Sequence, residues 1–296
     1  MRRDPRQNRI TLDHYFADKT AIDPCEWLRL EQGSKETAMR AVDLIAPIGK
    51  GQRGLIVSPP KAGKTILLKQ LCHAIATVAP SIKLYCFLLD ERPEEVTDFQ
   101  RDTPAKVVAS SNDRPNEEHI ELAQDFIQHA AQEAASGKDV VILLDSLTRL
   151  ARAFNRGSGS GRTLSGGLDS RAMELPRRFF GAARNIEGGG SLTILATILV
   201  ETGSRMDDVI FQEFKGTGNL ELVLSRSAAE QRLFPAINIR QSGTRKEEKL
   251  LPEDILRGTW KLRRVLGGLP DLEATRKLVE LLENHASNEK LLSPLF

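Results

Sequence analysis

An eight-residue stretch, SPPKAGKT at 58–65, constrains the fold of this chain more than any other part of the sequence. It follows the apolar run GLIV and precedes a helical pattern of apolar residues, namely Ile66, Leu67, Leu68, Leu71 and Ile75. This is the strand, phosphate loop and helix order of a nucleotide-binding core. Gly63 lets the backbone approach a phosphate, Lys64 has the reach to contact the β- and γ-phosphates, and Thr65 offers a hydroxyl ligand to Mg²⁺.

The loop departs from the strict G-x-x-x-x-G-K-[ST] pattern, because Ser58 stands in place of the first glycine and is followed by Pro59 and Pro60. On the tripeptide GKT alone, a strand-to-helix turn with an exposed lysine is an equal alternative. The apolar run before the loop and the helical pattern after it supply the context that the motif requires. The sequence therefore favours a nucleotide site.

Two further apolar runs end in charged residues. LYCFLLDERPEE ends its run at Asp90, Glu91 and Arg92, and DVVILLDSLTRLAR ends its run at Asp145. Ligands of open α/β sheets bind at the carboxyl ends of the strands, so these side chains are expected beside the phosphate loop. Asp145 is predicted to be the Walker B carboxylate that holds Mg²⁺. The alternative for each acid is a capping role at the start of the next helix.

Composition indicates an intracellular enzyme with one main domain, since 296 residues of which 40% are hydrophobic can bury a large core. The three cysteines form no C-x-x-C pair, so neither a disulfide framework nor a zinc site is expected, and Cys72 and Cys86 are interpreted as packing residues. The N-terminal MRRDPRQNRI lacks the apolar stretch of a signal peptide, and LTILATILV is half a membrane span. We expect a cytoplasmic protein that does not span a membrane.

Positive charge is concentrated between Arg149 and Arg184, where eight arginines face two acids, a local charge of +6. This asymmetry suggests a polyanionic partner. The same region contains RGSGSGRTLSGG (156–167), whose glycines and serines predict a mobile loop without a packed element. The alternative is a solvated linker between ordinary surface arginines. A second glycine-rich segment, FKGTGN (214–219), carries Lys215 and by itself would be an ordinary turn.

Apolar runs alternate with helical patterns along most of the chain. Strands are predicted near 54–57, 84–89, 107–110, 140–145, 192–199 and 220–224. Helices are predicted near 64–78, 116–135, 172–185, 206–213, 252–265 and 271–284. This order indicates an α/β fold with a mostly parallel sheet covered on both faces and a helical C-terminal tail.

Five long motifs resemble the ATPase domain of the bacterial transcription termination factor Rho family. They are GQRGLIVSPPKAGKT, LLDERPEEVTD, LLDSLTRLARAFN, FFGAARNIEGGGSLTILATILVETGSRMDDVIFQEFKGTGN and FPAINIRQSGTRKEE. The resemblance covers about residues 8–285 and implies a RecA-like P-loop NTPase core in a homohexameric ring. It further implies hydrolysis of ATP with Mg²⁺, translocation of single-stranded RNA, and RNA polymerase as a further candidate partner. A small residue in place of the first loop glycine is usual in this family.

The resemblance also implies roles for individual residues. The nucleotide-binding set is Lys61, Ala62, Gly63, Lys64, Thr65, Ile66 and Phe234, with Thr65 and Asp145 on the metal. Glu91 becomes the base that orients the attacking water, and Arg92 is similar to a switchable arginine near the γ-phosphate. Arg245 resembles an arginine finger from the adjacent subunit, with Arg232 supporting it. Without the family, a surface salt bridge is the alternative for these last two arginines.

Two segments resemble the family's RNA-contacting pore loops. Their residues are Arg162, Thr163, Leu164, Ser165, Gly166 and Gly167 in the first loop, and Lys215 and Gly216 in the second. Glycines would let these loops move, and the cations would contact phosphates of any RNA sequence.

One departure from the family concerns the N-terminus. A typical member has an N-terminal RNA-binding domain, whereas here we predict a connector-like segment at 1–40 before the ATPase and translocase domain at 41–296. A truncated chain and a naturally short paralogue both remain open. Two other functions remain open as well: a non-terminating ring ATPase acting on DNA or protein, and a regulatory subunit of full-length Rho.

Overall fold

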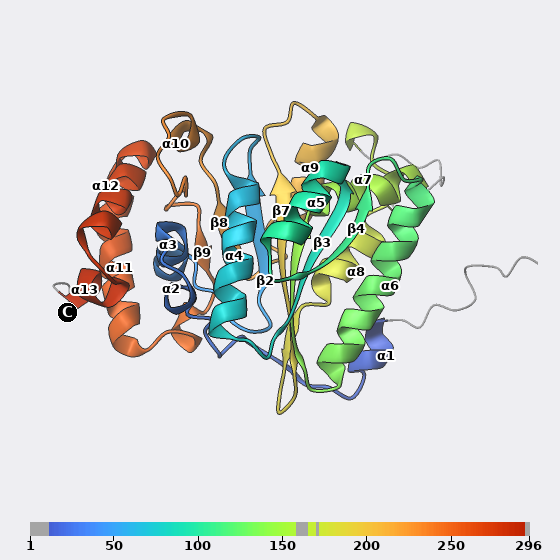
Figure 1. The fold of residues 1–296 in the computed structure, drawn as a ribbon, viewed down its shortest axis with the longest axis horizontal. Coiled ribbons are helices and arrows are strands. Elements are labelled where there is room, and N and C mark those ends of the chain that lie inside the picture. The colour runs from blue at the N-terminus through green and yellow to red at the C-terminus, as the bar shows by residue number, and fades with distance from the viewer. Residues whose placement is uncertain (1–11, 158–164, 170–171, 294–296) are drawn as a thin grey trace, which may run out of the picture.

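The computed structural model describes residues 12–157, 165–169 and 172–293, and these ranges contain a nine-stranded sheet (Figure 1). Across the sheet, the strands of the central path are β4 (Lys106–Ser111), β3 (Lys83–Glu91), β5 (Asp139–Asp145), β7 (Ser191–Leu199), β2 (Arg53–Ser58), β8 (Leu220–Val223) and β9 (Gly243–Thr244). Neighbours from β4 to β8 are parallel, and β9 is antiparallel to β8. The predicted α/β class with a mostly parallel sheet is confirmed.

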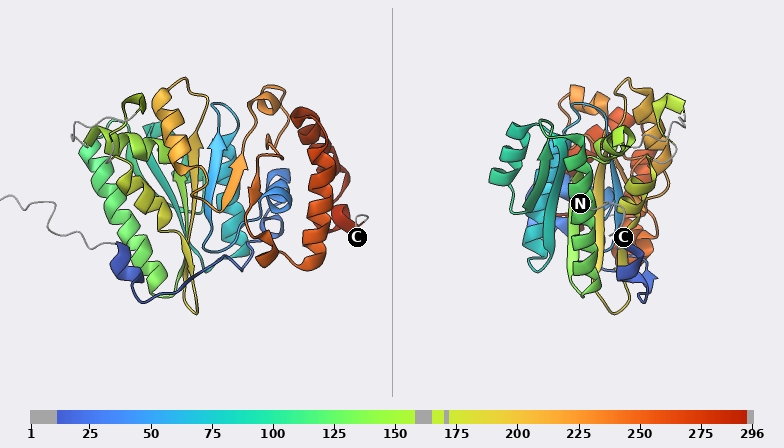
Figure 2. Two further views of the ribbon diagram at one scale, coloured as in Figure 1. Left: turned by 180° about the vertical axis from the view of Figure 1, so that it is seen from behind. Right: turned by 90° about the vertical axis from the view of Figure 1, so that its right-hand side faces the viewer.

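Helices cover both faces of the sheet (Figures 1 and 2). One face packs against α2 (Leu30–Gly33), α3 (Thr37–Ile45), α4 (Lys64–Val78), α5 (Pro93–Asp102) and α10 (Arg226–Glu230). Beyond β9, α11 (Glu253–Gly267), α12 (Asp271–Asn284) and α13 (Asn288–Leu292) extend the same core by packing on one another, on α3 and on α10 (Figure 1). The other face packs against α1 (Leu12–Phe16), α6 (Asn116–Ala135), α7 (Leu147–Gly157), α8 (Glu174–Gly181) and α9 (Arg205–Phe214).

The central strand β5 explains why the apolar runs of the sequence are continuous rather than alternating. Val141 and Leu143 lie in the core on one side of the sheet, and Val140, Ile142 and Leu144 lie in the core on the other side. A parallel strand that is buried on both faces requires an apolar side chain at every position. Continuous apolar runs therefore place β5 in the middle of the sheet.

The predicted helix at 172–185 is shorter than expected, because the chain leaves α8 at Gly181 and forms β6 (Arg184–Ile186). β6 turns back on β7 as an antiparallel hairpin, and it also pairs with β1 (Ala21–Ile22). The turn between β6 and β7 depends on glycine: a Cβ on Gly190 would lie 2.2 Å from the carbonyl oxygen of Lys138.

The prediction that 156–167 forms no packed element is wrong at both ends of the segment. Arg156 and Gly157 belong to α7, and a Cβ on Gly157 would lie 2.6 Å from Ile120. Ser165–Gly167 forms a 3₁₀ turn against α9. The glycines permit this close packing because they carry no side chain. Residues 158–164 lie outside the described residues.

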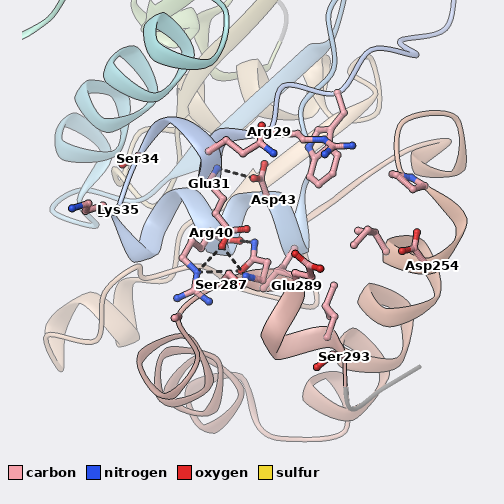
Figure 3. A pocket seen from close by; sticks show the side chains of 18 residues that line it. Arg29, Glu31, Ser34, Lys35, Arg40, Asp43, Asp254, Ser287, Glu289 and Ser293 are labelled. Atoms are coloured by element: carbon pink, nitrogen blue, oxygen red, sulfur yellow. Dashed lines mark hydrogen bonds and ion pairs between the residues drawn. The ribbon is translucent and has the colours of Figure 1, made fainter.

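Part of the predicted connector packs within the domain. Leu28, Leu30 and Met39 are buried in the core beside α4. Arg40 donates hydrogen bonds to the Leu282 carbonyl at 2.6 Å and to Asn288 at 3.3 Å, which joins α3 to the C-terminal helices (Figure 3). A cavity of about 1100 Å³ lies beside this junction. The boundary at residue 40 stays a prediction.

The cysteines and the apolar segments behave as ordinary packing elements. Cys72 and Cys86 are buried in one core, with their Sγ atoms 3.1 Å apart, which confirms the packing interpretation. Among the helices in the described ranges, none is both long and apolar enough to cross a bilayer.

Candidate nucleotide site

The loop at 58–65 joins the carboxyl end of β2 to the amino end of α4, as the sequence predicts. Gly63 precedes α4 with φ at +93°, a left-handed conformation that favours glycine. Lys61 in the same loop also has a positive φ, +64°. The amide groups in the first turn of a helix lack intrahelical partners, and they form the positive end of the helix dipole. The loop is therefore built to bind an anion.

Ser58 fits the position that normally carries glycine because its side chain is buried and turned onto its own loop. Its hydroxyl donates a hydrogen bond to the Pro59 carbonyl oxygen at 3.0 Å. The departure from the strict motif thus leaves the geometry between β2 and α4 intact.

Three charged side chains from separate elements meet at the carboxyl edge of the sheet. Lys64 Nζ lies 2.5 Å from Asp145 Oδ1 and 3.8 Å from Glu91 Oε1. Thr197 on β7 donates a second hydrogen bond to Asp145 Oδ1 at 2.8 Å. The sequence predicted that Asp145 and Glu91 lie beside the phosphate loop, and the structure brings them together there. It did not identify Thr197, which lies inside a continuous apolar run.

The oxygen atoms at this edge fit a magnesium ion that is held mainly by phosphate. Asp145 is buried next to the loop, and Thr65 lies at the start of α4. Within the described ranges, no three His, Cys, Asp or Glu side chains converge as a ligand set. Mg²⁺ takes few protein ligands and completes its shell with phosphate oxygens and water, so a carboxylate and a hydroxyl suit it.

Glu91 has the properties of a general base. Its side chain is 3% exposed, and burial, followed by the nearby charge of Asp145, raises its pKa to about 7. Arg149 Nη2 donates a hydrogen bond to Glu91 Oε2 at 3.1 Å. Arg149 Nε lies 3.0 Å from Oε1 but is not aligned for a hydrogen bond, so Oε1 accepts none from the described residues. One oxygen is thereby held by a hydrogen bond, and the other is buried without one among the described residues.

Arg149 is a further candidate for the site, and the sequence placed it in a different group. The local charge pattern predicts that Arg149 belongs to a group of arginines that bind a polyanion. In the structure, Arg149 donates hydrogen bonds to the Glu91 carboxylate and to the Asp90 carbonyl oxygen. Its spacing offered a signal: Arg149 follows Asp145 by four residues, so it lies in the first turn of the helix that leaves the same strand edge.

The local count of +6 overstates the unpaired positive charge of the arginine-rich region, while the polyanionic partner stays a prediction. Among the arginines of this region that the structure describes, several form ion pairs within the protein: Arg149 with Glu91, Arg152 with Asp207, Arg156 with Asp90, and Arg177 with Glu213. Opposite charges distant in the sequence neutralise them, and a count over a local window does not include those partners.

Arg92 lies next to Glu91 but faces solvent. It precedes α5, its side chain is 68% exposed, and among the described residues it forms an ion pair with Glu95 at 3.8 Å. An exposed arginine beside the base has room to move toward a bound phosphate.

A pocket of about 280 Å³ opens beside the phosphate loop on the α4 side. Phe234 is 43% exposed there, and a Cβ on Gly63 would lie 3.5 Å from its ring. Ala62 and Ile66 line the same pocket, together with Thr37 and Gln70, which the sequence did not suggest. A flat aromatic side chain next to the phosphate loop suits a stacked base. The structure thus brings Phe234 to the site that the resemblance implies.

Arg245 lies at the opposite end of the sheet. It follows Thr244, which pairs with Leu220, and Leu220 pairs with Gly54 near the amino end of β2. The phosphate loop begins after Ser58, four residues further along β2, a separation of roughly 13 Å along the strand. Arg245 is exposed at this end, with a guanidinium nitrogen 3.8 Å from the position of a Cβ on Gly216.

Arg232 and Arg245 are not brought together within one chain. Arg232 is exposed two residues before Phe234, at the nucleotide end of β8, whereas Arg245 lies beside the other end. Support of Arg245 by Arg232 of the same chain is therefore excluded. A joint action of the two would require a neighbouring chain.

The two candidate RNA segments lie at the two ends of α9. A Cβ on Gly166 would lie 3.0 Å from the Arg205 carbonyl oxygen at the first end, while Gly167 accepts a hydrogen bond from Asn155. Lys215 and Gly216 follow the other end, and both are exposed. Arg162, Thr163 and Leu164 lie outside the described residues.

The fold and the site together define a P-loop nucleotide-binding domain of the RecA-like class. The nucleotide-binding domain of the ATP synthase alpha/beta family matches residues 38–244. The transcription termination factor Rho of Micrococcus luteus is 56% identical over 94% of this chain, and that of Streptosporangium roseum is 55% identical over 94%. The chain belongs to the transcription termination factor Rho family. It spans 40% of the length of the first relative and 72% of the second.

Solved structures agree on the fold. An ATPase from the type III secretion system of pathogenic bacteria is 26% identical with a TM-score of 0.71, covering 87% of this chain and 82% of that one. The assembled ATPase EscN of the enteropathogenic E. coli type III secretion system is 24% identical with a TM-score of 0.72, covering 93% and 72%. At this identity, the second likeness concerns the fold alone.

Proposed function

We propose that this chain is an RNA-dependent ATPase that assembles into a homohexameric ring and moves along single-stranded RNA in the cytoplasm. One observation carries the proposal: the phosphate loop and Arg245 lie at opposite ends of one sheet, so a complete site needs two chains. A contact that joins one end of a protomer to the other end of the next is heterologous, and such contacts form a ring when the rotation between neighbours closes. The 56% identity to a Rho factor supports this arrangement.

At one end of the protomer, the residues are suited to bind ATP. Lys64 and the amides that begin α4 would contact the phosphates, and Phe234 would stack on the base. Thr65 and Asp145 would hold Mg²⁺, which supplies neutralisation of charge on the phosphate oxygens when it is bound.

Glu91 is suited to position and deprotonate the attacking water. Its Oε1 accepts no hydrogen bond from the described residues, and its pKa of about 7 divides the carboxyl between both protonation states near neutral pH. Arg149 fixes the other oxygen and favours the ionised form. A base poised near the working pH is the most effective in proton transfer.

The other end of the protomer supplies positive charge to the next chain. Arg53 and Arg245 lie close enough to repel each other, and the pKa of Arg53 is lowered, first by burial and then by Arg245. Two neighbouring cations suit an anion between them, and the γ-phosphate of a nucleotide on the adjacent chain is that anion in this proposal. Charge from an arginine in trans stabilises the transition state of phosphoryl transfer.

RNA would contact the segments at the two ends of α9. Lys215 is exposed among glycines, which suits sequence-tolerant contact with phosphates. Movement of α9 with nucleotide state would then move both segments. RNA polymerase as a partner, and termination itself, are part of the proposal through the relatives alone.

A steady-state ATPase assay with matched RNA and DNA tests this proposal. Poly-cytidine RNA is expected to stimulate hydrolysis, and DNA of the same length is not. Stimulation by DNA would favour the ring ATPase on another substrate. Absence of hydrolysis under all conditions would favour the regulatory subunit and overturn the proposed activity.

A further inference from the structure

The segment that carries Arg245, here called the finger segment (residues 243–249), is held from two sides. It begins in β9, where Thr244 also donates a side-chain hydrogen bond to the Pro47 carbonyl at 2.7 Å. Lys246 then adopts a left-handed backbone with φ at +57°, and a 3₁₀ turn follows at Glu247–Lys249. A left-handed lysine is uncommon, and it persists where surrounding contacts fix it. The contacts around Lys246 therefore decide where Arg245 lies.

On one side, α11 holds Glu247. Trp260 Nε1 donates a hydrogen bond to Glu247 Oε1 at 2.7 Å, and Arg263 Nη1 donates to Oε2 at 3.2 Å. Arg263 Nη2 also donates to the Ser242 carbonyl oxygen at 2.8 Å. This side belongs to the main body of the domain, because α11 packs in its core.

On the other side, a single carboxylate holds two lysines of the finger segment. Lys246 Nζ donates to both oxygens of Asp23, at 3.0 and 2.9 Å, and Lys249 Nζ donates to Oδ2 at 2.6 Å. These hydrogen bonds, from Lys249 first and Lys246 second, lower the pKa of Asp23, so the carboxylate is ionised at neutral pH. Asp23 directly follows β1 in the N-terminal segment, more than 220 residues before its partners.

We propose that Asp23 is a positioning residue for the arginine finger, acting through Lys246 and Lys249. The inference rests on the proposed function, because only a finger that acts in trans makes the position of this segment matter for hydrolysis. Arg245 lies between Thr244, which is held in β9, and Lys246, which is held by Asp23; we call the contacts of Asp23 with Lys246 and Lys249 the Asp23 clamp. A guanidinium nitrogen of Arg245 lies 3.8 Å from the position of a Cβ on Gly216. Displacement of a catalytic cation by about 1 Å lowers rates strongly. Through Asp23, the N-terminal segment therefore sets the hydrolysis rate of the adjacent subunit.

The test combines a local measurement with a kinetic one. Amide hydrogen–deuterium exchange over residues 243–249 of Asp23→Asn is expected to be roughly three- to tenfold faster than in the unchanged chain, since exposed ion pairs contribute modestly. The kcat for ATP is expected to fall by a similar factor, roughly three- to tenfold, while KM stays unchanged, because the nucleotide end of the same chain is not touched.

Three variants separate positioning from general damage. Asp23→Glu keeps the charge and should restore exchange and kcat. Lys249→Gln removes one lysine partner of Asp23 and should reproduce the changes in exchange and kcat expected in Asp23→Asn. Asp125→Asn is the matched control, an exposed aspartate on α6, and should change neither readout.

The outcomes distinguish the clamp from the proposed function. Unchanged exchange over 243–249 in both Asp23→Asn and Lys249→Gln overturns the clamp, whatever the ATPase activity. Faster exchange with unchanged kcat also overturns the positioning role. Faster exchange in a chain that hydrolyses no ATP under any condition contradicts the proposed function and leaves the clamp as a structural contact.

Discussion

The two ends of the sheet differ in how their charges are arranged. At the carboxyl end, Glu91 and Asp145 are buried and Lys64 lies between them, so charges of both signs are held at short distances. At the amino end, Arg245 and Lys215 are exposed, and Arg53 is near enough to Arg245 to be affected by its charge. The first end is a preorganised pocket, and the second is a cationic surface. The difference supports the proposal that opposite ends of two neighbouring chains together form one site.

The largest effect is expected from the amino end. Arg245→Ala should lower kcat by about 10³- to 10⁵-fold, the range for an arginine finger, without weakening ATP binding to the same chain. Stopped-flow or equilibrium binding of a fluorescent ATP analogue measures the second quantity. Arg240→Ala is the control, since Arg240 is a nearby exposed arginine that pairs with Asp271. Loss of nucleotide binding in Arg245→Ala would mean that Arg245 contacts the nucleotide of its own chain, and the two ends of the sheet would then not act in separate chains.

At the carboxyl end, Glu91→Gln should lower kcat by about 10²- to 10⁴-fold and retain ATP binding. In the unchanged chain, activity should rise with pH through about 7, because the base must be ionised, and this limb should vanish in the variant. Glu94→Gln, a surface change in the first turn of α5, serves as the control. Normal turnover in Glu91→Gln would remove this residue from the base role.

Folding stability provides a check on Glu91 that does not depend on activity. A carboxyl whose pKa is raised in the folded state binds a proton that the unfolded chain releases, so its contribution to stability falls as pH rises from about 4.5 to about 7. Glu91→Gln should flatten the decline of the unfolding free energy over this window in urea titrations. An unchanged decline would contradict the raised pKa.

A change in the pocket proposed to hold the nucleobase should alter KM for ATP rather than kcat. Phe234→Ala should raise KM for ATP about tenfold, since stacking on an aromatic ring contributes about 1–3 kcal/mol. Phe234→Tyr keeps a ring and should stay near the original KM. A fall in kcat without a change in KM would indicate that Phe234 acts elsewhere.

The smallest effect is expected at Arg149. Arg149→Met removes a cation that favours ionised Glu91, so the pKa of Glu91 should rise by about one unit and activity at pH 7 should fall about fivefold. Activity should recover toward higher pH. Arg156→Met is the control, because Arg156 contacts Asp90 rather than Glu91. A fall that is equal at every pH would mean that Arg149 acts through structure alone.

The sequence predicted the features that are contiguous along the chain. The order of β2, loop and α4, and the acids at the ends of β3 and β5, follow from apolar runs that end in charged residues. The short helix α3 was not predicted, because it buries Arg40 and Asp43 along with its apolar residues. Arg40 is satisfied by groups about 240 residues away, which no local pattern contains.

The relative positions of residues at the two ends of the sheet depend on strand register, which local sequence patterns do not predict. The separation of Arg232 from Arg245 follows from the pairing of Thr244 with Leu220 and of Leu220 with Gly54. Likewise, the contact of Asp23 with Lys246 joins segments far apart in the chain. Local patterns specify elements, but they do not specify which end of a sheet a distant loop will reach.

Mixed assembly of two inactive variants tests most directly whether the two ends complete each other. Lys64→Ala chains lack a working phosphate loop, and Arg245→Ala chains lack the finger. In rings formed from equal amounts of both, about a quarter of the interfaces should pair an intact loop with an intact finger, because each contact joins opposite ends of two chains. Recovery of hydrolysis toward that fraction is the predicted result. A mixture as inactive as each variant alone, after subunit exchange is verified, would contradict a site shared between neighbouring chains.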